Sequence, residues 1–214
     1  MNAIAGLWEF LDRGGVVIWI IAALSVATLS IALWKLWRLM MTGAWGGGAR
    51  AEAALALWVG GQGEAAQAAL QGRAGLRGRL ALSAMQAAAT LPDAAAREET
   101  ARIARKLMEK ARRGLRALEL SATIAPLLGL LGTVIGMIAA FQALQEAGAR
   151  ADPATLAGGI WEALLTTAAG MSVAILASLV LSWFDAVTER LGHDMEDIAT
   201  RVFLARLRAR EGGA

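Results

Sequence analysis

One carboxylate stands out because it opens a long uncharged stretch. Glu162 is followed by 22 residues without a formal charge, up to Asp185. At helical spacing it shares a face with hydroxyl-bearing and small residues: Thr166, Ala169, Val173 and Ala177. An acid at the edge of a membrane span, or inside it, is costly and tends to face an aqueous path or a partner. The predicted chemistry is proton binding; the alternative is that Glu162 only caps the helix end in interfacial water.

Two threonines are the polar groups best placed to extend a proton path from this carboxylate. Thr167 lies in the same stretch as Glu162, and Thr133 lies in the uncharged stretch before it. A hydroxyl both donates and accepts, so it can pass a proton through water or order that water. The residues alone favour the other interpretation, in which each threonine bonds its own i−4 carbonyl.

Small residues mark a contact face on the second uncharged stretch. Four positions at spacings of 4, 3 and 4 share one helical face: Gly129, Thr133, Gly136 and Ala140. Gly132 and Gly136 form a G-x-x-x-G pair, which lets helix backbones approach closely in lipid. Pro126 is expected to bend this helix near its inner end, and Gly170 is the corresponding small residue of the third stretch.

The elements that carry these residues are predicted to be transmembrane helices. Uncharged runs of 21, 26 and 22 residues follow Arg13, Glu119 and Glu162, and the chain is 57% hydrophobic but only 18% charged. Each run reaches the roughly 20 residues needed to cross a hydrocarbon core of about 30 Å. The fold class is therefore an all-α membrane protein with three transmembrane helices and long cytoplasmic helical extensions. An ordinary soluble enzyme is excluded.

The basic residues predict the orientation. Of 21 Lys and Arg residues, 14 lie between Lys35 and Glu119 and five lie in the tail after residue 185. Because Lys and Arg avoid translocated loops, residues 1–13 and the loop 146–161 are expected to be periplasmic. Residues 38–119 and 185–214 are expected to be cytoplasmic. The transmembrane helices then occupy 14–37, 120–145 and 162–184.

The first span is expected to be a retained anchor rather than a cleaved signal peptide. A signal peptide needs a basic start and an apolar core of about 7–15 residues, whereas here Glu9 and Asp12 precede a 21-residue run. Residues 1–13 are expected to form an amphipathic lead-in, with the following residues at helical spacing: Ile4, Leu7, Trp8 and Leu11.

The cytoplasmic segment is predicted to be helical throughout. Residues 50–90 have the pattern of short alanine-rich helices separated by Gly60-Gly61 and by the glycines from Gly72 to Gly78. Pro92-Asp93 marks the start of another helix. We expect that helix to run through residue 119 and to continue into the second span.

The composition argues against metal, cofactor and enzymatic chemistry. The chain has no cysteine, and its only histidine, His193, is expected to be solvated. It contains no phosphate-binding loop and no nucleophile elbow. The positive charge is confined to the segments beside the spans, so a nucleic-acid partner is not expected.

Two motifs resemble the MotA/TolQ/ExbB proton-channel family, and they resemble its ExbB/TolQ branch most. The first is Ala125-Pro126-x-x-Gly129-Leu130-x-Gly132-Thr133-Val134-x-Gly136, preceded by Leu118-Glu119-Leu120. The second is Gly159-Ile160-x-Glu162-Ala163-Leu164-x-Thr166-Thr167-Ala168-x-Gly170, followed by Val173-Ala174-Ile175. MotA-type members have four spans, so three spans favour the ExbB/TolQ branch.

The resemblance implies a homopentamer in the bacterial inner membrane whose second and third helices line a pore. The family's pore glutamate and threonines match Glu162, Thr133 and Thr167. The pore would hold an ExbD- or TolR-like single-span partner, and work would pass to a TonB- or TolA-like protein. After the segment that corresponds to Val173-Ala174-Ile175, the family usually has a proline and then a Tyr-Asn pair, where this chain has Leu176 and Leu181-Ser182. We therefore expect a straighter inner half of the third span.

The sequence leaves several functions open. The leading hypothesis is a proton-channel and motor subunit, ExbB-like or TolQ-like, and the absence of other span carboxylates favours a proton over sodium. The alternative is a membrane scaffold that assembles helices and conducts nothing. An intramembrane enzyme is disfavoured because no span offers a histidine as base to Ser172 or Ser178.

Overall fold

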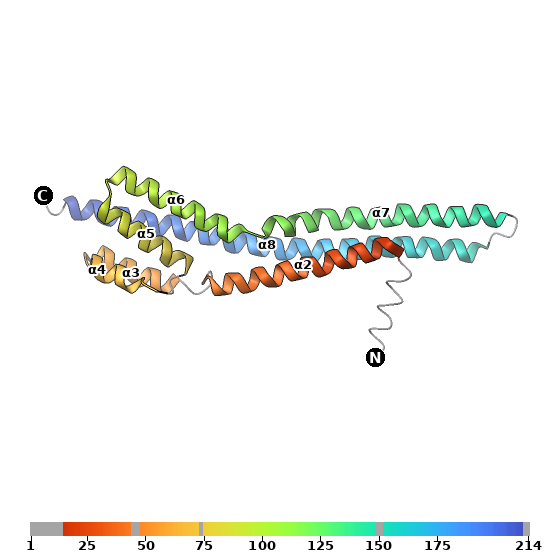
Figure 1. Ribbon diagram of the computed structural model, residues 1–214, viewed down its shortest axis with the longest axis horizontal. Helices are drawn as coiled ribbons and strands as arrows, with labels where there is room; N and C mark the ends of the chain where they lie inside the picture. The colour runs from red at the N-terminus through yellow and green to blue at the C-terminus, as the bar shows by residue number, and fades with distance from the viewer. Residues whose placement is uncertain (1–14, 44–47, 73–74, 149–151, 212–214) are drawn as a thin grey trace, which may run out of the picture. The chain divides into compact units, whose positions relative to one another are not determined.

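The computed structural model describes residues 15–43, 48–72, 75–148 and 152–211. The expected lead-in over residues 1–13 and the basic residue of the predicted second loop, Arg150, lie outside the described residues. The described chain is all-helical, as predicted (Figure 1). Its helices are α2 (Gly15–Met41), α3 (Gly48–Val59), α4 (Gly63–Ala69), α5 (Leu76–Thr90), α6 (Asp93–Arg112), α7 (Leu115–Ala147) and α8 (Pro153–Glu211).

Three helices are long and apolar enough to cross a membrane, which confirms the predicted number. They are α2, the stretch Asp93–Ala147 whose apolar part is α7, and α8. The chain is therefore a multi-pass membrane protein. Helix α8 already begins at Pro153, so it includes the second half of the range 146–161 that the sequence assigns to a loop. The limits of the membrane along each helix stay a prediction.

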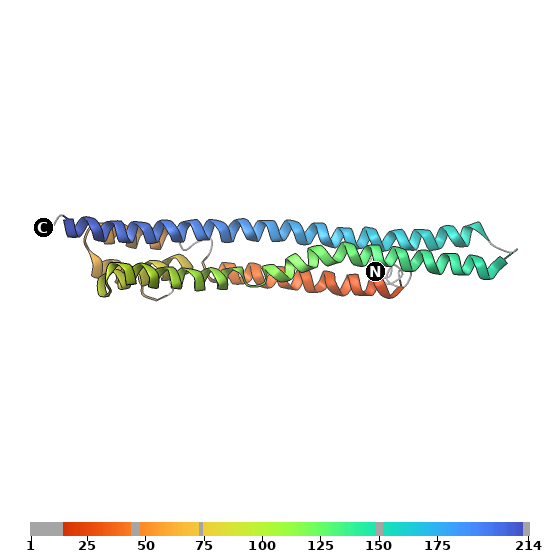
Figure 2. The same ribbon diagram turned by 90° about the horizontal axis from the view of Figure 1, so that it is seen from above.

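The chain divides into two compact units. The first unit contains Met1–Leu33 and Gly114–Ser182. In it, α7 and the first half of α8 run side by side in opposite directions, and α2 lies along this pair (Figures 1 and 2). Val17, Ile18 and Ile21 of α2 are buried against it, whereas most large apolar side chains of all three helices are exposed. That outward apolar surface is what a lipid or a neighbouring subunit would cover.

The second unit contains Trp34–Arg113 and Trp183–Ala214. Its core is built mostly from alanine, with Leu55, Met85, Val202 and Phe203 as larger members. Small side chains let α3, α5 and the end of α8 approach closely, and single polar contacts then fix the register. The Trp58 Nε1 donates to the carbonyl of Val202 at 3.1 Å, and the Arg77 guanidinium lies 2.6 Å from the Asp194 carboxylate.

The breaks between the short helices of the second unit are where glycines predict them. Helix α3 ends before Gly60-Gly61, and α4 is followed by Gly72, which has a φ of +97°. Gly78, in contrast, lies inside α5 and is buried. Helix α6 begins at Asp93, whose acidic side chain suits the positive end of the helix dipole, and it ends with Lys110 and Arg112.

The expected continuous helix from residue 92 into the second span is wrong. Helix α6 ends at Arg112, and α7 begins at Leu115. Gly114 between them has a φ of +88°, a left-handed conformation that glycine adopts without steric cost and that stops the helical hydrogen-bond ladder. A basic last turn followed by glycine is a helix-end signal, and Arg112-Arg113-Gly114 carries it.

Lys35 secures the end of α6. Its side chain is 1% exposed, and its Nζ donates to the carbonyl of Ala111 and, at 2.6 Å, to the carbonyl of Arg113. The last carbonyls of a helix have no intrahelical partner, so a buried ammonium satisfies them and complements the negative end of the helix dipole. The sequence identified Lys35 only as a marker of orientation.

Candidate functional site: the α7–α8 seam and its flanking residues

Helices α7 and α8 meet along a line of small residues, which we call the α7–α8 seam. Its members are Ala125, Gly129, Gly132, Gly136 and Ala140 of α7, and Gly159, Ala163, Thr166 and Gly170 of α8. As the residue numbers increase along α7, those of the contacted residues decrease along α8, from the Ala125–Gly170 contact to the Ala140–Gly159 contact. This register is that of an antiparallel pair, and it belongs wholly to the first unit.

The glycines of the seam allow a separation that any Cβ would prevent. A Cβ on Gly170 would lie 2.5 Å from the Ala125 carbonyl oxygen and 3.0 Å from the Gly129 Cα. A Cβ on Gly136 would lie 2.8 Å from the Ala163 Cβ, and one on Gly132 would overlap the Thr166 side chain. Small residues that permit such close backbone approach are how helices associate in lipid. Gly129, Gly132, Gly136 and Gly170, which the sequence predicts as packing residues, all lie at these close contacts.

The seam differs from the predicted faces by one residue on each helix. On α7 it follows Gly129, Gly132 and Gly136, so Gly132 takes the place that the sequence gave to Thr133. On α8 it includes the buried Ala163 rather than Glu162, which is exposed. Successive residues of a helix point about 100° apart, so Thr133 and Glu162 lie beside the seam. Gly159 and Ala163 were missed, although their 4-residue spacing is a signal of small-residue packing.

The two adjacent threonines of α8 both reach across the seam to one carbonyl. The Thr167 hydroxyl donates to the Gly129 carbonyl oxygen at 2.9 Å. The buried Thr166 hydroxyl donates to the Ala163 carbonyl at 2.7 Å and has the Gly129 carbonyl as a second acceptor at 3.3 Å. For Thr167 the expected i−4 bond is therefore wrong, because the closer acceptor belongs to α7. These hydroxyls fix the register of the two helices.

Thr133 lies on a different surface from the other two threonines. Its hydroxyl donates to the Leu130 carbonyl at 2.6 Å, an i−3 partner close to the expected i−4 one. It also lines a groove of about 490 Å³ on α7, together with Met137, Phe141, Gln142 and Gln145. Thr133 is therefore the threonine whose hydroxyl lies on the outside of the helix pair. Pro126 lies inside α7, one residue after Ala125 of the seam.

Glu162 is exposed and has no polar partner in the part of the chain that the structure describes. No hydrogen bond or ion pair joins its carboxylate to another described residue, Thr133 and Thr167 included. Its neighbours are Trp161 and Leu164, which are 66% and 58% exposed. A carboxylate on an apolar surface near the start of a span needs water or another chain beside it. The structure thus places Glu162 and Thr133 on outer surfaces and Thr166 and Thr167 inside the pair.

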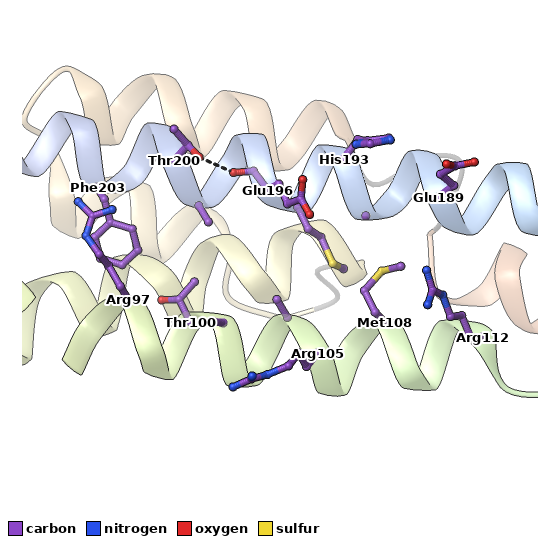
Figure 3. A pocket seen from close by; sticks show the side chains of 15 residues that line it. Arg97, Thr100, Arg105, Met108, Arg112, Glu189, His193, Glu196, Thr200 and Phe203 are labelled. Carbon is purple, nitrogen blue, oxygen red and sulfur yellow. Dashed lines mark hydrogen bonds between the residues drawn. The ribbon is translucent and has the colours of Figure 1, made fainter. Parts of the chain in front are cut away.

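A separate cavity of about 720 Å³ lies in the second unit between α6 and α8. Figure 3 shows Met108 directed from α6 toward α8, while His193 points away from α6. The Arg97 guanidinium stacks on the Phe203 ring at 4.7 Å, and Thr200 bonds the Glu196 carbonyl within its own helix. The expected solvated state of His193 fits its exposure. The residues around this cavity offer no nucleophile–base pair.

Within the described residues, no group of three or more His, Cys, Asp or Glu side chains is arranged to hold a metal ion. One unpaired carboxylate, one outward threonine and a tightly packed helix pair are the components of the candidate site.

Comparison with known proteins decides the family. The profile of the MotA/TolQ/ExbB proton channel family matches residues 73–197, which is more than half of the chain and includes the whole α7–α8 seam. The chain belongs to this family. The resemblance drawn from the two motifs is confirmed, and it extends to the ExbB branch.

Individual members of the ExbB branch align over a shorter region. The ExbB-like protein 1 of Synechocystis is 52% identical over 77 residues, 35% of this chain and 30% of that protein. The biopolymer transport protein ExbB1 of Vibrio cholerae is 41% identical over 86 residues, 38% of each chain. ExbB of Neisseria gonorrhoeae is 36% identical over 94 residues, 44% of this chain and 42% of that protein. Each alignment therefore covers less than half of the relative's length.

Proposed function

We propose that the chain is the channel subunit of an inner-membrane motor that couples the proton motive force to mechanical work. Its family is a proton-channel family, and the relatives it resembles are named biopolymer transport proteins. On this proposal it energises outer-membrane transport, as an ExbB-like protein, or envelope maintenance, as a TolQ-like one. Residues 1–13 would be periplasmic and the C-terminal tail cytoplasmic, as the distribution of basic residues favours.

The observation that carries the proposal is the unpartnered Glu162. Its carboxylate faces outward from an apolar helix and finds no cation or hydrogen-bond donor among the described residues. Isolated from water, a charged carboxylate would be expensive, and a neutral one would still need a partner. A water-filled pore shared with other copies and with a second protein supplies water to the charged carboxylate and hydrogen-bond partners to the neutral one. Glu162 would then bind and release the transported proton.

The seam supports the proposal by giving that carboxylate a rigid frame. The threonine hydroxyls on the Gly129 carbonyl and the glycine contacts hold α8 in one register on α7. Thr133 on the outer groove would order water along the path. Thr167 and Thr166 would fix the position of Glu162 along the axis of α7. A fixed wall is needed if a partner helix is to move against it.

The proposed assembly is a homopentamer around an ExbD/TolR-like single-span protein, with a TonB- or TolA-like protein receiving the work. The large exposed apolar surface of α7 and α8 fits burial against other subunits. Copurification from native membranes tests this directly. A single-span protein with an intramembrane aspartate should accompany the chain in fewer copies than the chain itself.

Proton flux tests the role of Glu162. The complex is reconstituted in liposomes that contain a pH-sensitive dye, and a potassium diffusion potential drives uptake. Glu162→Gln should abolish flux while the mass of the complex stays unchanged by light scattering. Glu146→Gln is the matched control because Glu146 is also exposed, near the end of α7, and should conduct like the wild type. Wild-type flux through the Glu162→Gln complex would refute the proposed role.

A non-conducting scaffold is the second candidate, and the tight seam favours it. Thr133→Ala separates the two functions because Thr133 lies outside the seam, so its loss should leave assembly intact. The matched control is Thr123→Ala, which removes another α7 hydroxyl bonded within its own helix, to Glu119 at 3.0 Å. A channel predicts lower flux for Thr133→Ala than for Thr123→Ala. An absence of proton flux in the wild-type complex and in both variants, with equal assembly, would favour the scaffold.

A further inference from the structure

A second cavity of the second unit lies where the first spanning helix ends. It has a volume of about 660 Å³, and its wall includes Met40 and Met41 at the end of α2. The other walls come from the helices that follow, with Arg50 on α3, Arg79 on α5 and Lys110 on α6. The cavity thus joins the end of a membrane span to three cations from three different helices.

The charge of this cavity is of one sign. No acidic residue is among the described residues that line it. Arg50, Arg79 and Lys110 also make no side-chain hydrogen bond or ion pair with any residue that the structure describes. Other arginines of the same unit are paired, as Arg77 is with Asp194. Three unpaired like charges around one concave space repel one another and attract an anion.

The level of the cavity along α2 indicates where that anion would come from. Trp34 and Trp37, one to two turns before the cavity, are 47% and 66% exposed, and the Arg38 guanidinium lies 5.0 Å from the Trp34 ring centre. Exposed tryptophans beside basic residues are typical of the headgroup region of a bilayer. Met40 and Met41 are 56% and 74% exposed, so the cavity has an apolar edge as well as a cationic interior.

We propose that this pocket binds the phosphate headgroup of an anionic membrane phospholipid such as phosphatidylglycerol. Arg50 and Arg79 would each offer a planar fork of N–H donors to the phosphate oxygens, and Lys110 would add a point charge. Met40 and Met41 would contact the first carbons of the acyl chains. Basic pockets beside transmembrane helices bind such headgroups. Inorganic phosphate could bind the three cations in the same way, but it has no acyl chains to contact Met40 and Met41.

Native mass spectrometry of the full chain in a neutral maltoside detergent tests the proposal. The protein is titrated with dioctanoyl phosphatidylglycerol, with dioctanoyl phosphatidylcholine and with sodium phosphate at constant ionic strength. One phosphatidylglycerol molecule should bind with preference over phosphatidylcholine, and millimolar phosphate should not displace it. Binding of phosphate with equal or higher affinity than phosphatidylglycerol would overturn the assignment to a lipid.

Two variants with the same net charge locate the site. Arg50→Gln/Arg79→Gln/Lys110→Gln should weaken phosphatidylglycerol binding about a hundredfold, from about fivefold for each cation near an anionic headgroup. The control is a second triple variant that removes three exposed cations outside the pocket: Lys106→Gln, Arg190→Gln and Arg208→Gln. It should bind within about twofold of the wild type.

Equal weakening by the two triple variants would overturn the proposal, because it would indicate attraction by overall charge only. A third variant guards against a folding defect. Arg50→Lys/Arg79→Lys keeps the charge of the pocket but removes the two planar forks, so it should bind more weakly than the wild type and more tightly than the triple glutamine variant. Binding no tighter than that of the triple glutamine variant, with unchanged circular dichroism and thermal unfolding, would show that charge in the pocket is not what holds the lipid.

Discussion

Replacing Gly170 by alanine tests the closeness of α7 and α8. The added Cβ would lie 2.5 Å from the Ala125 carbonyl oxygen and 3.1 Å from the Gly129 backbone nitrogen. Both are backbone atoms of α7, so no side chain can rotate away, and the helices must move apart. Overpacking of this kind costs about 1–3 kcal/mol, against a gain in helix propensity of about 1 kcal/mol. We expect Gly170→Ala to lower the free energy of unfolding by up to about 2 kcal/mol.

Two glycines of the same helix provide matched controls. Gly158 has no atom within 4 Å of its would-be Cβ, so Gly158→Ala should be stabilising by about 0.5–1 kcal/mol through helix propensity alone. At Gly192 the nearest atom is the flexible Met108 Cε at 3.3 Å, and Gly192→Ala should be close to neutral. The order of stability should be Gly158→Ala, then Gly192→Ala, then Gly170→Ala.

The measurement is reversible unfolding in mixed micelles of maltoside and dodecyl sulfate, followed by tryptophan fluorescence. Gly170→Ala should unfold at a lower dodecyl sulfate fraction than the wild type, and the midpoint of Gly158→Ala should be equal or higher. If Gly170→Ala were as stable as Gly158→Ala, the Ala125 carbonyl would not be in contact with α8. The antiparallel register derived from the seam would then be wrong.

Three further predictions concern the second unit and its boundary. Gly114→Ala should destabilise the chain by about 1 kcal/mol, because alanine is strained at a φ of +88°; unchanged unfolding would contradict the helix break. Trp58→Phe removes the bond to the Val202 carbonyl and should cost about 1 kcal/mol in the same assay, whereas an unaltered midpoint would argue against that bond. The Arg102 guanidinium holds the pKa of Glu99 below its ordinary 4.5. Since a lowered folded-state pKa contributes stability above the ordinary value and loses it as pH falls, the pair should weaken below about pH 4.5. Carboxyl NMR should detect a rise in the Glu99 pKa in Arg102→Gln, and no rise would refute the pairing.

The helical class and the number of spans could be predicted because they depend on how charged and apolar residues are distributed along the chain. Runs of more than 20 uncharged residues leave few structures other than transmembrane helices. The glycines that separate α3, α4 and α5 were also sufficient signals. The helical spacing of small residues on α7 indicated that one face of this helix packs on another helix, and Gly129 and Gly136 do lie on the seam.

The exact face of each helix could not be predicted, because the sequence of α7 fits two phases. Gly129-Thr133-Gly136 and Gly129-Gly132-Gly136 are both regular helical patterns, and they differ only in which flank of the glycines meets α8. The side chains of α8 determine which of these two faces of α7 packs against it. Thr166 fills the space that a Cβ on Gly132 would need, and Ala163 is small enough to contact Gly136, which Glu162 is not. Such pair packing is not encoded in either helix alone.

The buried state of Lys35 was equally hidden, because its acceptors are the carbonyls of Ala111 and Arg113, more than 70 residues away. Backbone carbonyls have no signature in the sequence, and only the end of α6 at Arg112 leaves them unpaired. A lysine after a long apolar run therefore looked like an ordinary topology marker.

That buried amine makes the protein a natural reporter of its own conformation. The chain has three lysines, and two of them, Lys106 and Lys110, are exposed on α6. An amine-reactive label applied to the intact protein should therefore modify those two quickly and Lys35 slowly, since the Lys35 nitrogen is engaged by two carbonyls and shielded from solvent. The rate at which the label appears on Lys35, read by peptide mass spectrometry, measures how often the junction between α2 and the end of α6 opens. No engineered probe is needed to compare that rate in resting and energised membranes.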